Sequence, residues 1–408
     1  MTAPKDKAKK FLTPGADAAN HGSMSSRFEA VWRAVQEKVD SGWAPGIVAG
    51  VRHRGTTEYF AAGVRTLGGP EPMHAGTPFR MASLGKPMGG ALAVAMMADG
   101  TLAPDDPADM WLPELAFPHV LTSPDAPLDS TVAAEHEITV RQLLTLTHGM
   151  GYMDPDTPLA HAMDAAGLFT GARRHTLHPD EYMSRVGGLP LAHQPGTRWS
   201  YHVGSDILSV LLARAGRAPL GQLLQEYIGT PLGLSATAFY GDPAELPTAY
   251  EPSAEGLAVF DGPSGQFSQQ PEFESFGGGL VSSVADYLTF LAALADDTLL
   301  PAELRAEMTR DQLTEAQRGG SEELLGPGMS WGWQVSVQTG EADPWGAPGR
   351  FGWMGGSGTT AFVDPSRELI GVLCTQRIIM DAYDDFSWFW GPLAKAAGPA
   401  GTRAGQAG

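Results

Sequence analysis

The chain has 408 residues, enough for two or three domains or for one large enzyme with two lobes. Of these residues 43% are hydrophobic, which is enough for a sizeable core. Its formal net charge of −19 argues against a surface that binds nucleic acid or an anionic membrane. The single cysteine, Cys374, excludes an internal disulfide, and its apolar neighbours predict a structural cysteine in a buried strand.

Both ends of the chain are predicted to carry little structure. Residues 1–23 begin with basic residues but lack the apolar segment of a secretory signal, and no later run approaches the length of a transmembrane helix. We therefore expect a cytoplasmic protein with no membrane partner. A disordered leader is predicted over residues 1–23, and a flexible tail over residues 398–408, which are rich in glycine and alanine.

Hydrophobic periodicity predicts the helices and strands in chain order. The ordered chain opens with an amphipathic helix, in which apolar residues recur at helical spacing from Phe28 to Val39, and a β-hairpin follows it. Strands are predicted over residues 47–51, 57–64, 331–337, 359–363 and 369–375. Further helices are predicted over residues 138–146, 206–215, 220–227, 284–295 and 386–397, the last with a possible break at Pro392.

The predicted strands come from both ends of the chain, whereas the middle is mainly helical. This distribution indicates an α+β fold, in which one antiparallel sheet is built from N- and C-terminal segments and carries an inserted, mainly helical lobe. The N- and C-terminal helices are expected to flank the sheet. The expected domains are residues 24–80 together with 326–397 for the sheet and residues 81–325 for the helical lobe.

The most informative segment for function is residues 83–86, which read Ser-Leu-Gly-Lys. If a helix begins here, Lys86 lies about one turn after Ser83 on the same face, with its amine near the hydroxyl. Pro87 lacks an N–H and fits only a first helical turn, which supports this start. The alternative is an ordinary helix start, with Ser83 as N-cap and Lys86 as a solvated charge. Because residues 87–97 carry no charge, Lys86 is expected to be buried with the helix. A lysine is rarely buried unless it has a specific partner or role.

A serine and lysine pair needs a third group that carries the proton to the leaving group. The best candidate is Tyr201, which lies between a Pro-Gly turn and a helix that Ser205 or Asp206 could cap. A phenol on a short loop between fixed elements can be aimed at the serine. The alternative is a tyrosine that only packs this loop onto the lobe.

Glycines are dense in residues 350–360, just before a predicted strand. Glycine lets a backbone approach a ligand closely, so a free N–H here could stabilise an oxyanion together with the N–H of Ser83. The alternative is a flexible glycine loop before a hairpin. Residues 277–279, which are all glycine, predict close packing at a helix start.

Three segments, in this order and at these separations, resemble the three sequence boxes of the class C β-lactamase and penicillin-binding-protein superfamily. They are residues 83–86, residues 195–201 and residues 353–356. Among the branches of the superfamily, the family VIII carboxylesterases are the nearest match. The resemblance covers about residues 28–393 and implies a β-lactamase/transpeptidase-like fold.

The resemblance implies that Ser83 is the nucleophile and that Lys86 and Tyr201 form a coupled acid–base pair. Either a partly neutral lysine or a tyrosinate beside the ammonium could accept the Ser83 proton, and the sequence leaves both open. The implied oxyanion hole consists of the backbone N–H groups of Ser83 and Gly356. The acyl-enzyme would then be hydrolysed by water, or captured by another alcohol or amine if the pocket excludes water.

Departures from the penicillin-recognising pattern decide the expected substrate. Relatives carry an Asn two residues after the Tyr and a Lys-Thr-Gly or His-Thr-Gly third box, where this chain has Val203 and the triplet Trp353, Met354 and Gly355. The groups that hold the amide and carboxylate of the antibiotic are therefore missing. Together with His202, these residues form the expected substrate pocket, which suits a neutral acyl or alkyl group. We predict a serine carboxylesterase for small-molecule esters of short-to-medium acyl chains, with no metal and no cofactor.

Competing functions fit the sequence less well. The chain has no Gly-x-Ser-x-Gly elbow, which removes the usual α/β-hydrolase triad. His175 and His178 form only a His-x-x-His in a polar loop, where a surface or N-cap role is favoured over a metal site. The main catalytic alternative is a β-lactamase, D-aminopeptidase, DD-peptidase or amidase on the same scaffold. The non-catalytic alternative is a binding protein that is acylated without turnover.

Overall fold

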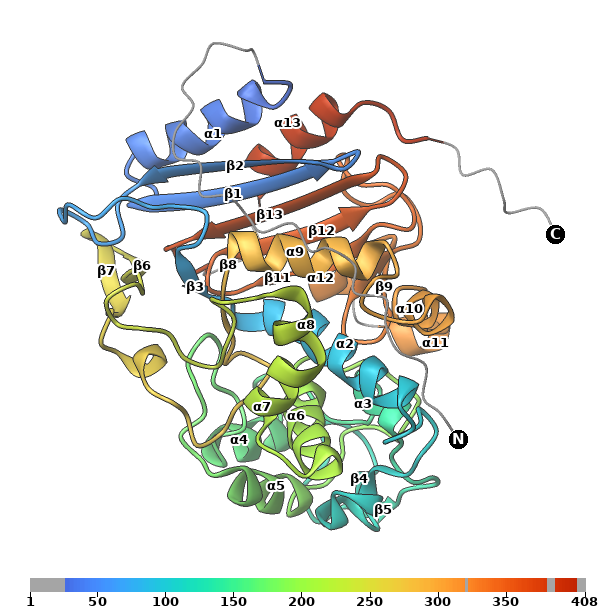
Figure 1. Cartoon of the computed structure of the whole chain (residues 1–408). Helices are drawn as coiled ribbons and strands as arrows, with labels where there is room; N and C mark the ends of the chain where they lie inside the picture. The colour runs from blue at the N-terminus through green and yellow to red at the C-terminus, as the bar shows by residue number, and fades with distance from the viewer. Residues whose placement is uncertain (1–25, 320–321, 380–385, 402–408) are drawn as a thin grey trace, which may run out of the picture.

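The computed structural model describes residues 26–319, 322–379 and 386–401, and its centre is a seven-stranded antiparallel sheet (Figure 1). The strands lie side by side in the order β2-β1-β13-β12-β11-β10-β9. Their bounds are β1 Gly46–His53, β2 Thr56–Gly63, β9 Met329–Trp331, β10 Ser336–Gln338, β11 Phe351–Gly355, β12 Thr359–Asp364 and β13 Leu369–Thr375. Both ends of the chain thus contribute to one antiparallel sheet, which confirms the predicted α+β architecture.

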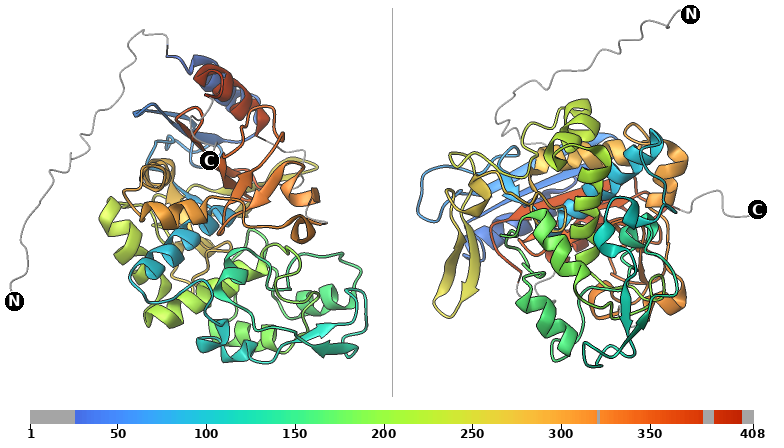
Figure 2. Two further views of the ribbon diagram at one scale, coloured as in Figure 1. Left: turned by 90° about the vertical axis from the view of Figure 1, so that its right-hand side faces the viewer. Right: turned by 90° about the horizontal axis from the view of Figure 1, so that it is seen from below.

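Helices cover both faces of this sheet. α1 Glu29–Asp40 and α13 Ser387–Ala397 lie together on one face, as Figure 1 shows above the sheet. α9 Val284–Ala295 packs against β1 and β13 on the other face, on the side of the helical lobe. The side view in Figure 2 shows α1 and α13 at one end of the molecule and the green helices of the lobe at the other.

Alternation along β1 explains why the sheet has a hydrophobic core on each face. Ile47, Ala49 and Val51 belong to the cluster under α1 and α13, whereas Val48 belongs to the larger cluster on the lobe side. Successive side chains of a strand point to opposite faces, so one buried strand serves both clusters. Cys374 pairs with Val48 in the register of β13 and is fully buried, which confirms the predicted structural cysteine.

The lobe is built around two long buried helices, α2 Gly85–Ala98 and α6 Val203–Gly216, which pack against each other. The shorter helices are α3 Val140–Leu144, α4 Pro158–Ala165, α5 Pro179–Gly187, α7 Leu220–Leu224, α8 Thr230–Leu232, α10 Ala302–Met308, α11 Glu315–Arg318 and α12 Glu322–Leu325. Single 3₁₀ turns occupy Ala82–Leu84, Ala108–Met110, Pro113–Leu115 and Gln266–Ser268, and a π-helical turn occupies Gln225–Gly229.

Three small two-stranded sheets lie outside the central sheet. They pair β3 Pro78–Arg80 with β8 Val281–Ser283, β4 His119–Leu121 with β5 Thr131–Ala133, and β6 Ala249–Ser253 with β7 Gly256–Asp261. The β3–β8 pair joins the segment before α2 to the segment before α9. It therefore fixes the start of the buried helix α2 relative to a helix that covers the sheet.

The structure corrects three details of the predicted elements. Residues 331–337 do not form a single strand. They contain the turn between β9 and β10, where Gln334 adopts a φ of 61° as the chain reverses direction. The glycine-rich residues 351–355 form strand β11, because pairing with β12 satisfies their backbone groups. α13 continues through Pro392, since Phe389 and Leu393 on either side of it are buried in the same core.

α9 also corrects the predicted division of the domains. It lies within residues 81–325, which were assigned to the helical lobe, yet its apolar face packs on β1 and β13. Val284 and Leu288 are buried in the cluster on this side of the sheet. The sheet therefore takes one of its covering helices from the middle of the chain.

The ends of the chain are only partly covered by the structure. The predicted leader over residues 1–23 and residues 402–408 of the predicted tail lie outside the described residues. Among the helices that are described, none combines the length and the apolar character needed to cross a membrane.

Candidate active site

Ser83 lies in a 3₁₀ turn between the short strand β3 and the buried helix α2. The turn spans Ala82–Leu84, and α2 begins at the next residue, so Pro87 falls in the first helical turn as predicted. Ala82 has a φ of 44°, a left-handed conformation that is rare outside glycine and is often found at functional sites. Ser83 itself is partly exposed, so a substrate can reach its hydroxyl.

Lys86 is fully buried and contacts the serine directly. Its Nζ lies 3.0 Å from Ser83 Oγ and donates to the carbonyl of Gly277 at 2.9 Å. Burial lowers the pKa of the Lys86 ammonium to about 7, against the smaller opposite effect of the Asp206 carboxylate. The sequence-based expectation of a buried lysine beside the serine is confirmed by this geometry.

Gly85 explains how Gly277 reaches the lysine. A Cβ on Gly85 would lie 2.5 Å from the carbonyl oxygen of Phe276, so any other residue would push that backbone away from α2. The predicted close packing of residues 277–279 therefore occurs, and it places the Gly277 carbonyl beside Lys86. No pattern in the sequence indicates that this carbonyl is a hydrogen-bond acceptor of the site.

Tyr201 is the third group, and it is buried next to the first two. Its ring centroid lies 4.7 Å from Lys86 Nζ, and its hydroxyl accepts a hydrogen bond of 2.6 Å from Trp353 Nε1. Burial raises the pKa of the Tyr201 phenol well above its ordinary value, although hydrogen bonds with Ser83 and Trp353 lower it in part. At neutral pH the phenol is thus protonated, while Lys86 is close to its titration midpoint.

Gly356 directly follows β11 and is exposed, at the turn into β12. Thr359 Oγ1 donates to the carbonyl of Met81 at 3.0 Å, which joins this turn to the segment that carries Ser83. Among the hydrogen bonds of the described residues, none uses the backbone N–H of Ser83 or of Gly356. Both N–H groups therefore keep a free donor among the described residues.

The residues expected to line a substrate pocket are in different environments. Met354 is 41% exposed, whereas Trp353 is 5% exposed and Gly355 is buried. Val203, the first residue of α6, has no exposed surface, and His202 is 2% exposed. Val203 and His202 therefore lie behind the site and do not face the solvent, because α6 starts three residues earlier than predicted and buries them.

An exposed aromatic residue that was not predicted stands at the site entrance. Tyr152 is 44% exposed, and its ring stacks on the imidazole of His202 with centroids 5.2 Å apart. It also meets Tyr201 edge-on at 5.6 Å and Phe169 at 5.1 Å. In the sequence, Tyr152 is simply an aromatic residue in the loop after α3. Its contacts with Tyr201 and His202, about fifty residues later in the chain, cannot be inferred from that.

The two loop histidines have separate roles. His178 accepts from the N–H of Asp180 and caps α5, as predicted. The side chain of His175 is 4% exposed and lies 3.3 Å from a carboxylate oxygen of Asp206, so the predicted surface role is wrong for it. Asp206 is likewise no helix cap but a buried residue inside α6. The described residues contain no cluster of three or more His, Cys, Asp or Glu suited to a metal ion.

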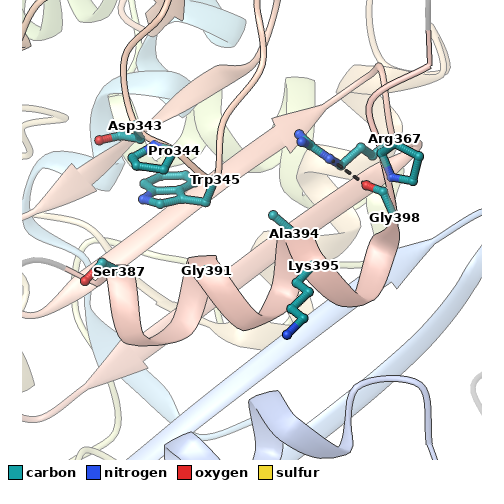
Figure 3. Close-up of a pocket in the computed structure, with 10 residues that line it drawn as sticks. Asp343, Pro344, Trp345, Arg367, Ser387, Gly391, Ala394, Lys395 and Gly398 are labelled. Atoms are coloured by element: carbon teal, nitrogen blue, oxygen red, sulfur yellow. Dashed lines mark hydrogen bonds between the residues drawn. The ribbon is translucent and has the colours of Figure 1, made fainter.

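A cavity of about 760 Å³ lies away from these residues, on the face of the sheet that α13 covers (Figure 3). Figure 3 shows Asp343, Pro344 and Trp345 at one end of it and Arg367 with Gly398 at the other. None of its lining residues belongs to the group around Ser83. We assign this cavity no part in the chemistry of Ser83.

The chain is similar to known proteins over most of its length. The chain is 32% identical over 358 residues to Protein Rv1367c of Mycobacterium tuberculosis, covering 83% of this chain and 87% of that protein. It is 30% identical over 408 residues to Esterase EstB of Burkholderia gladioli, covering 94% and 97%.

Among solved structures, the chain resembles "EstCE1, a hydrolase with promiscuous acyltransferase activity", with a TM-score of 0.76 and 23% identity. This likeness covers 91% of the present chain and 98% of the other and concerns the fold. The sequence pattern of the beta-lactamase family matches residues 31–385, which include Ser83, Lys86, Tyr201 and Gly356. The chain therefore belongs to the beta-lactamase family.

Proposed function

We propose that the chain is a serine carboxylesterase that cleaves small esters of short-to-medium acyl chains through an acyl-enzyme on Ser83. The observation that carries this proposal is the 3.0 Å contact between Lys86 and Ser83, combined with a lysine pKa of about 7. A buried amine that is half neutral near pH 7 can accept the serine proton without a histidine. Membership of the beta-lactamase family and the similarity to Esterase EstB support this ester-cleaving chemistry.

In the acylation step, the neutral amine of Lys86 takes the proton of Ser83 as Oγ forms a bond to the ester carbonyl carbon. The carbonyl oxygen becomes an oxyanion, which the N–H groups of Ser83 and Gly356 stabilise. The bond to the alcohol oxygen then breaks. That oxygen receives the proton of the Tyr201 hydroxyl, which is replaced from the Lys86 ammonium 4.7 Å from the tyrosine ring.

Deacylation reverses these roles. A water molecule gives its proton to the Tyr201 and Lys86 pair as its oxygen attacks the acyl carbon, and the same N–H groups stabilise the second oxyanion. Ser83 Oγ leaves and regains its proton from Lys86. The chemistry uses only groups of this chain, because the base, the acid and the oxyanion donors are all present around Ser83.

The surroundings of the site favour a neutral, apolar substrate group. Trp353 stands where the penicillin-recognising relatives carry the Lys or His of the third box. Its indole N–H already donates to the Tyr201 hydroxyl. The ring of Tyr201 contacts Trp353, and the exposed ring of Tyr152 meets Tyr201 edge-on, so this part of the site has an aromatic surface. A carboxylate would find no cation there among these three residues, so an uncharged acyl or alkyl group of modest size is the better fit.

A panel of chromogenic substrates tests the proposal. p-Nitrophenyl acetate, butyrate, octanoate and palmitate should be compared with a chromogenic cephalosporin, and the shorter esters should show the highest kcat/KM. Fast cephalosporin turnover with inert esters would instead indicate a β-lactamase. Mass spectrometry of the protein after incubation with each substrate tests the binding-protein alternative. A stable adduct on Ser83 without turnover would indicate an acylated binding protein.

A further inference from the structure

Asp206 is a buried carboxylate that the proposed steps do not use. It lies in the first turn of α6, is 1% exposed, and contacts the side chains of His175, His202 and Ser275. The Nε2 atoms of His175 and His202 lie 3.3 and 3.5 Å from its Oδ2, and the hydroxyl of Ser275 donates to its Oδ1. A carboxylate so completely removed from water must contribute something that offsets its desolvation.

One connection leads from Asp206 to Tyr201. His202 directly follows the tyrosine and has φ 89° and ψ −72°, a conformation that a residue with a side chain rarely adopts. Its imidazole is held between the carboxylate of Asp206 and the ring of Tyr152. The backbone at His202 sets the direction of the preceding residue, so the contact between Asp206 and the His202 ring links the carboxylate to the Tyr201 phenol.

A second connection leads from Asp206 to Lys86. Ser275 Oγ donates to Asp206 and accepts the N–H of Gly277 at 2.8 Å, and the carbonyl of Gly277 accepts from Lys86 Nζ at 2.9 Å. A Cβ on Gly277 would lie 2.2 Å from Asp206 Oδ1, so only glycine allows this approach. The carboxylate therefore reaches the lysine through one hydroxyl and one peptide group.

The charge of Asp206 also acts on the site. Burial by itself raises the pKa of Asp206, but His175, His202 and Ser275 more than offset this and hold its pKa well below its ordinary value. The titratable groups around it are Lys86 on α2, Tyr182 on α5, Tyr152 and His175 in loops, and Tyr201 with His202 before and at the start of α6. Burial lowers the pKa of His202 to about 3, so this ring is neutral near pH 7.

We propose that Asp206 is a positioning residue that orients both proton carriers of the site, Tyr201 through His202 and Lys86 through Ser275 and Gly277. The inference rests on the proposed function, because it assigns a role within the same catalytic group. As an anion, Asp206 also opposes the effect of burial on Lys86 and keeps the lysine titrating close to neutrality.

The test is Asp206→Asn, which keeps the size of the side chain and an oxygen for Ser275 but removes the charge. We expect kcat for p-nitrophenyl butyrate to fall about tenfold or more, with KM changed by less than about threefold. The rising limb of the kcat/KM profile should move to lower pH by about one unit, because Lys86 loses the anion that raises its pKa.

Asp286→Asn is the matched control. Asp286 is also a buried carboxylate, 8% exposed, but it accepts from Ala236 N–H and Thr237 Oγ1 on the α9 side of the lobe. This control should leave kcat and the pH profile unchanged even if it lowers the thermal midpoint. Ser275→Ala is a second test, since it cuts only the connection to Lys86 and should lower kcat by a smaller factor, without moving the pH limb to lower values.

Several outcomes would overturn the inference. It is wrong if folded Asp206→Asn has the kcat and pH profile of the wild type, or if Asp286→Asn loses as much rate with the same profile. If Asp206→Asn does not fold, Ser275→Ala decides, and a wild-type kcat then overturns the inference. A wild-type protein that hydrolyses none of the esters overturns the proposed function itself, whereas failure of the present inference appears only in the variants.

Discussion

Two of the buried carboxylates, Asp261 and Asp206, have very different neighbours. Asp261 accepts from Arg80 Nε at 2.7 Å and from a backbone N–H, and the guanidinium of Arg80 also donates to two carbonyls. Asp206 faces the imidazoles of His175 and His202 instead. An arginine keeps its charge in a protein, whereas a histidine or a nearby lysine can lose it.

This difference separates a structural ion pair from a cluster that serves chemistry. The pair of Arg80 and Asp261 has every charge matched by a fixed partner, so its removal should affect folding. Asp206 lies among groups that change protonation, including Lys86 with a pKa of about 7, and such clusters are typical of active sites. We therefore expect substitutions around Ser83 to reduce rate, and substitutions around Asp261 to reduce stability.

Removal of the nucleophile should have the largest effect on rate. Ser83→Ala is expected to lower kcat/KM by about 10⁴-fold or more, because no other group can form the acyl-enzyme. The thermal midpoint should stay within about 2 °C of the wild type, because the partly exposed hydroxyl contributes little to packing. Ser184→Ala on the exposed face of α5 is the control and should keep the full rate. Ester hydrolysis at the wild-type rate in Ser83→Ala would contradict the proposed mechanism.

Removal of the structural arginine should have the largest effect on stability. Arg80→Met leaves Asp261 buried without its partner and is expected to lower the free energy of unfolding in urea by about 3–5 kcal/mol. Arg33→Met breaks an exposed ion pair with Glu29 on α1 and should cost less than about 0.5 kcal/mol. Similar losses of unfolding free energy in the two variants would show that the buried ion pair stabilises the fold no more than an exposed one.

The pH dependence of the wild type should report on Lys86. Its pKa is lowered by burial to about 7, so the neutral amine needed as base is lost as the pH falls below this value. We expect kcat/KM to fall about tenfold per pH unit on the acidic side and to level off on the alkaline side. A profile that rises only above about pH 9 would instead indicate a lysine with an ordinary pKa.

Removal of one hydrogen bond to the tyrosine should have the smallest effect. Trp353→Phe deletes the N–H that donates to Tyr201 and is expected to lower kcat about three- to tenfold, as the loss of one buried hydrogen bond would. Trp331→Phe is the matched control, because the Trp331 ring also contacts Tyr201 but its Nε1 has no hydrogen-bond partner among the described residues. Equal losses in both variants would mean that only the ring packing matters.

Much of the fold could be predicted from the sequence, since periodic apolar patterns report which face of an element is buried. The helix over residues 284–295 and the strands near both ends were found in this way. The strand β11 was predicted as a glycine loop, because Gly352, Gly355 and Gly356 interrupt its apolar residues and its pairing with β12 is not visible in the sequence. α6 was expected to start later, because its first residues carry no side-chain cap that the sequence could reveal.

The sequence by itself was enough to name the three catalytic candidates, because Ser83, Lys86 and Tyr201 lie in short segments that resemble the sequence boxes of the superfamily. Only the tertiary structure brought Asp206 and the Gly277 carbonyl to the same place, because contacts between distant segments leave no periodic signal in the chain. The pKa of Lys86 was likewise decided by the fold, since it depends on how completely water is excluded around the amine.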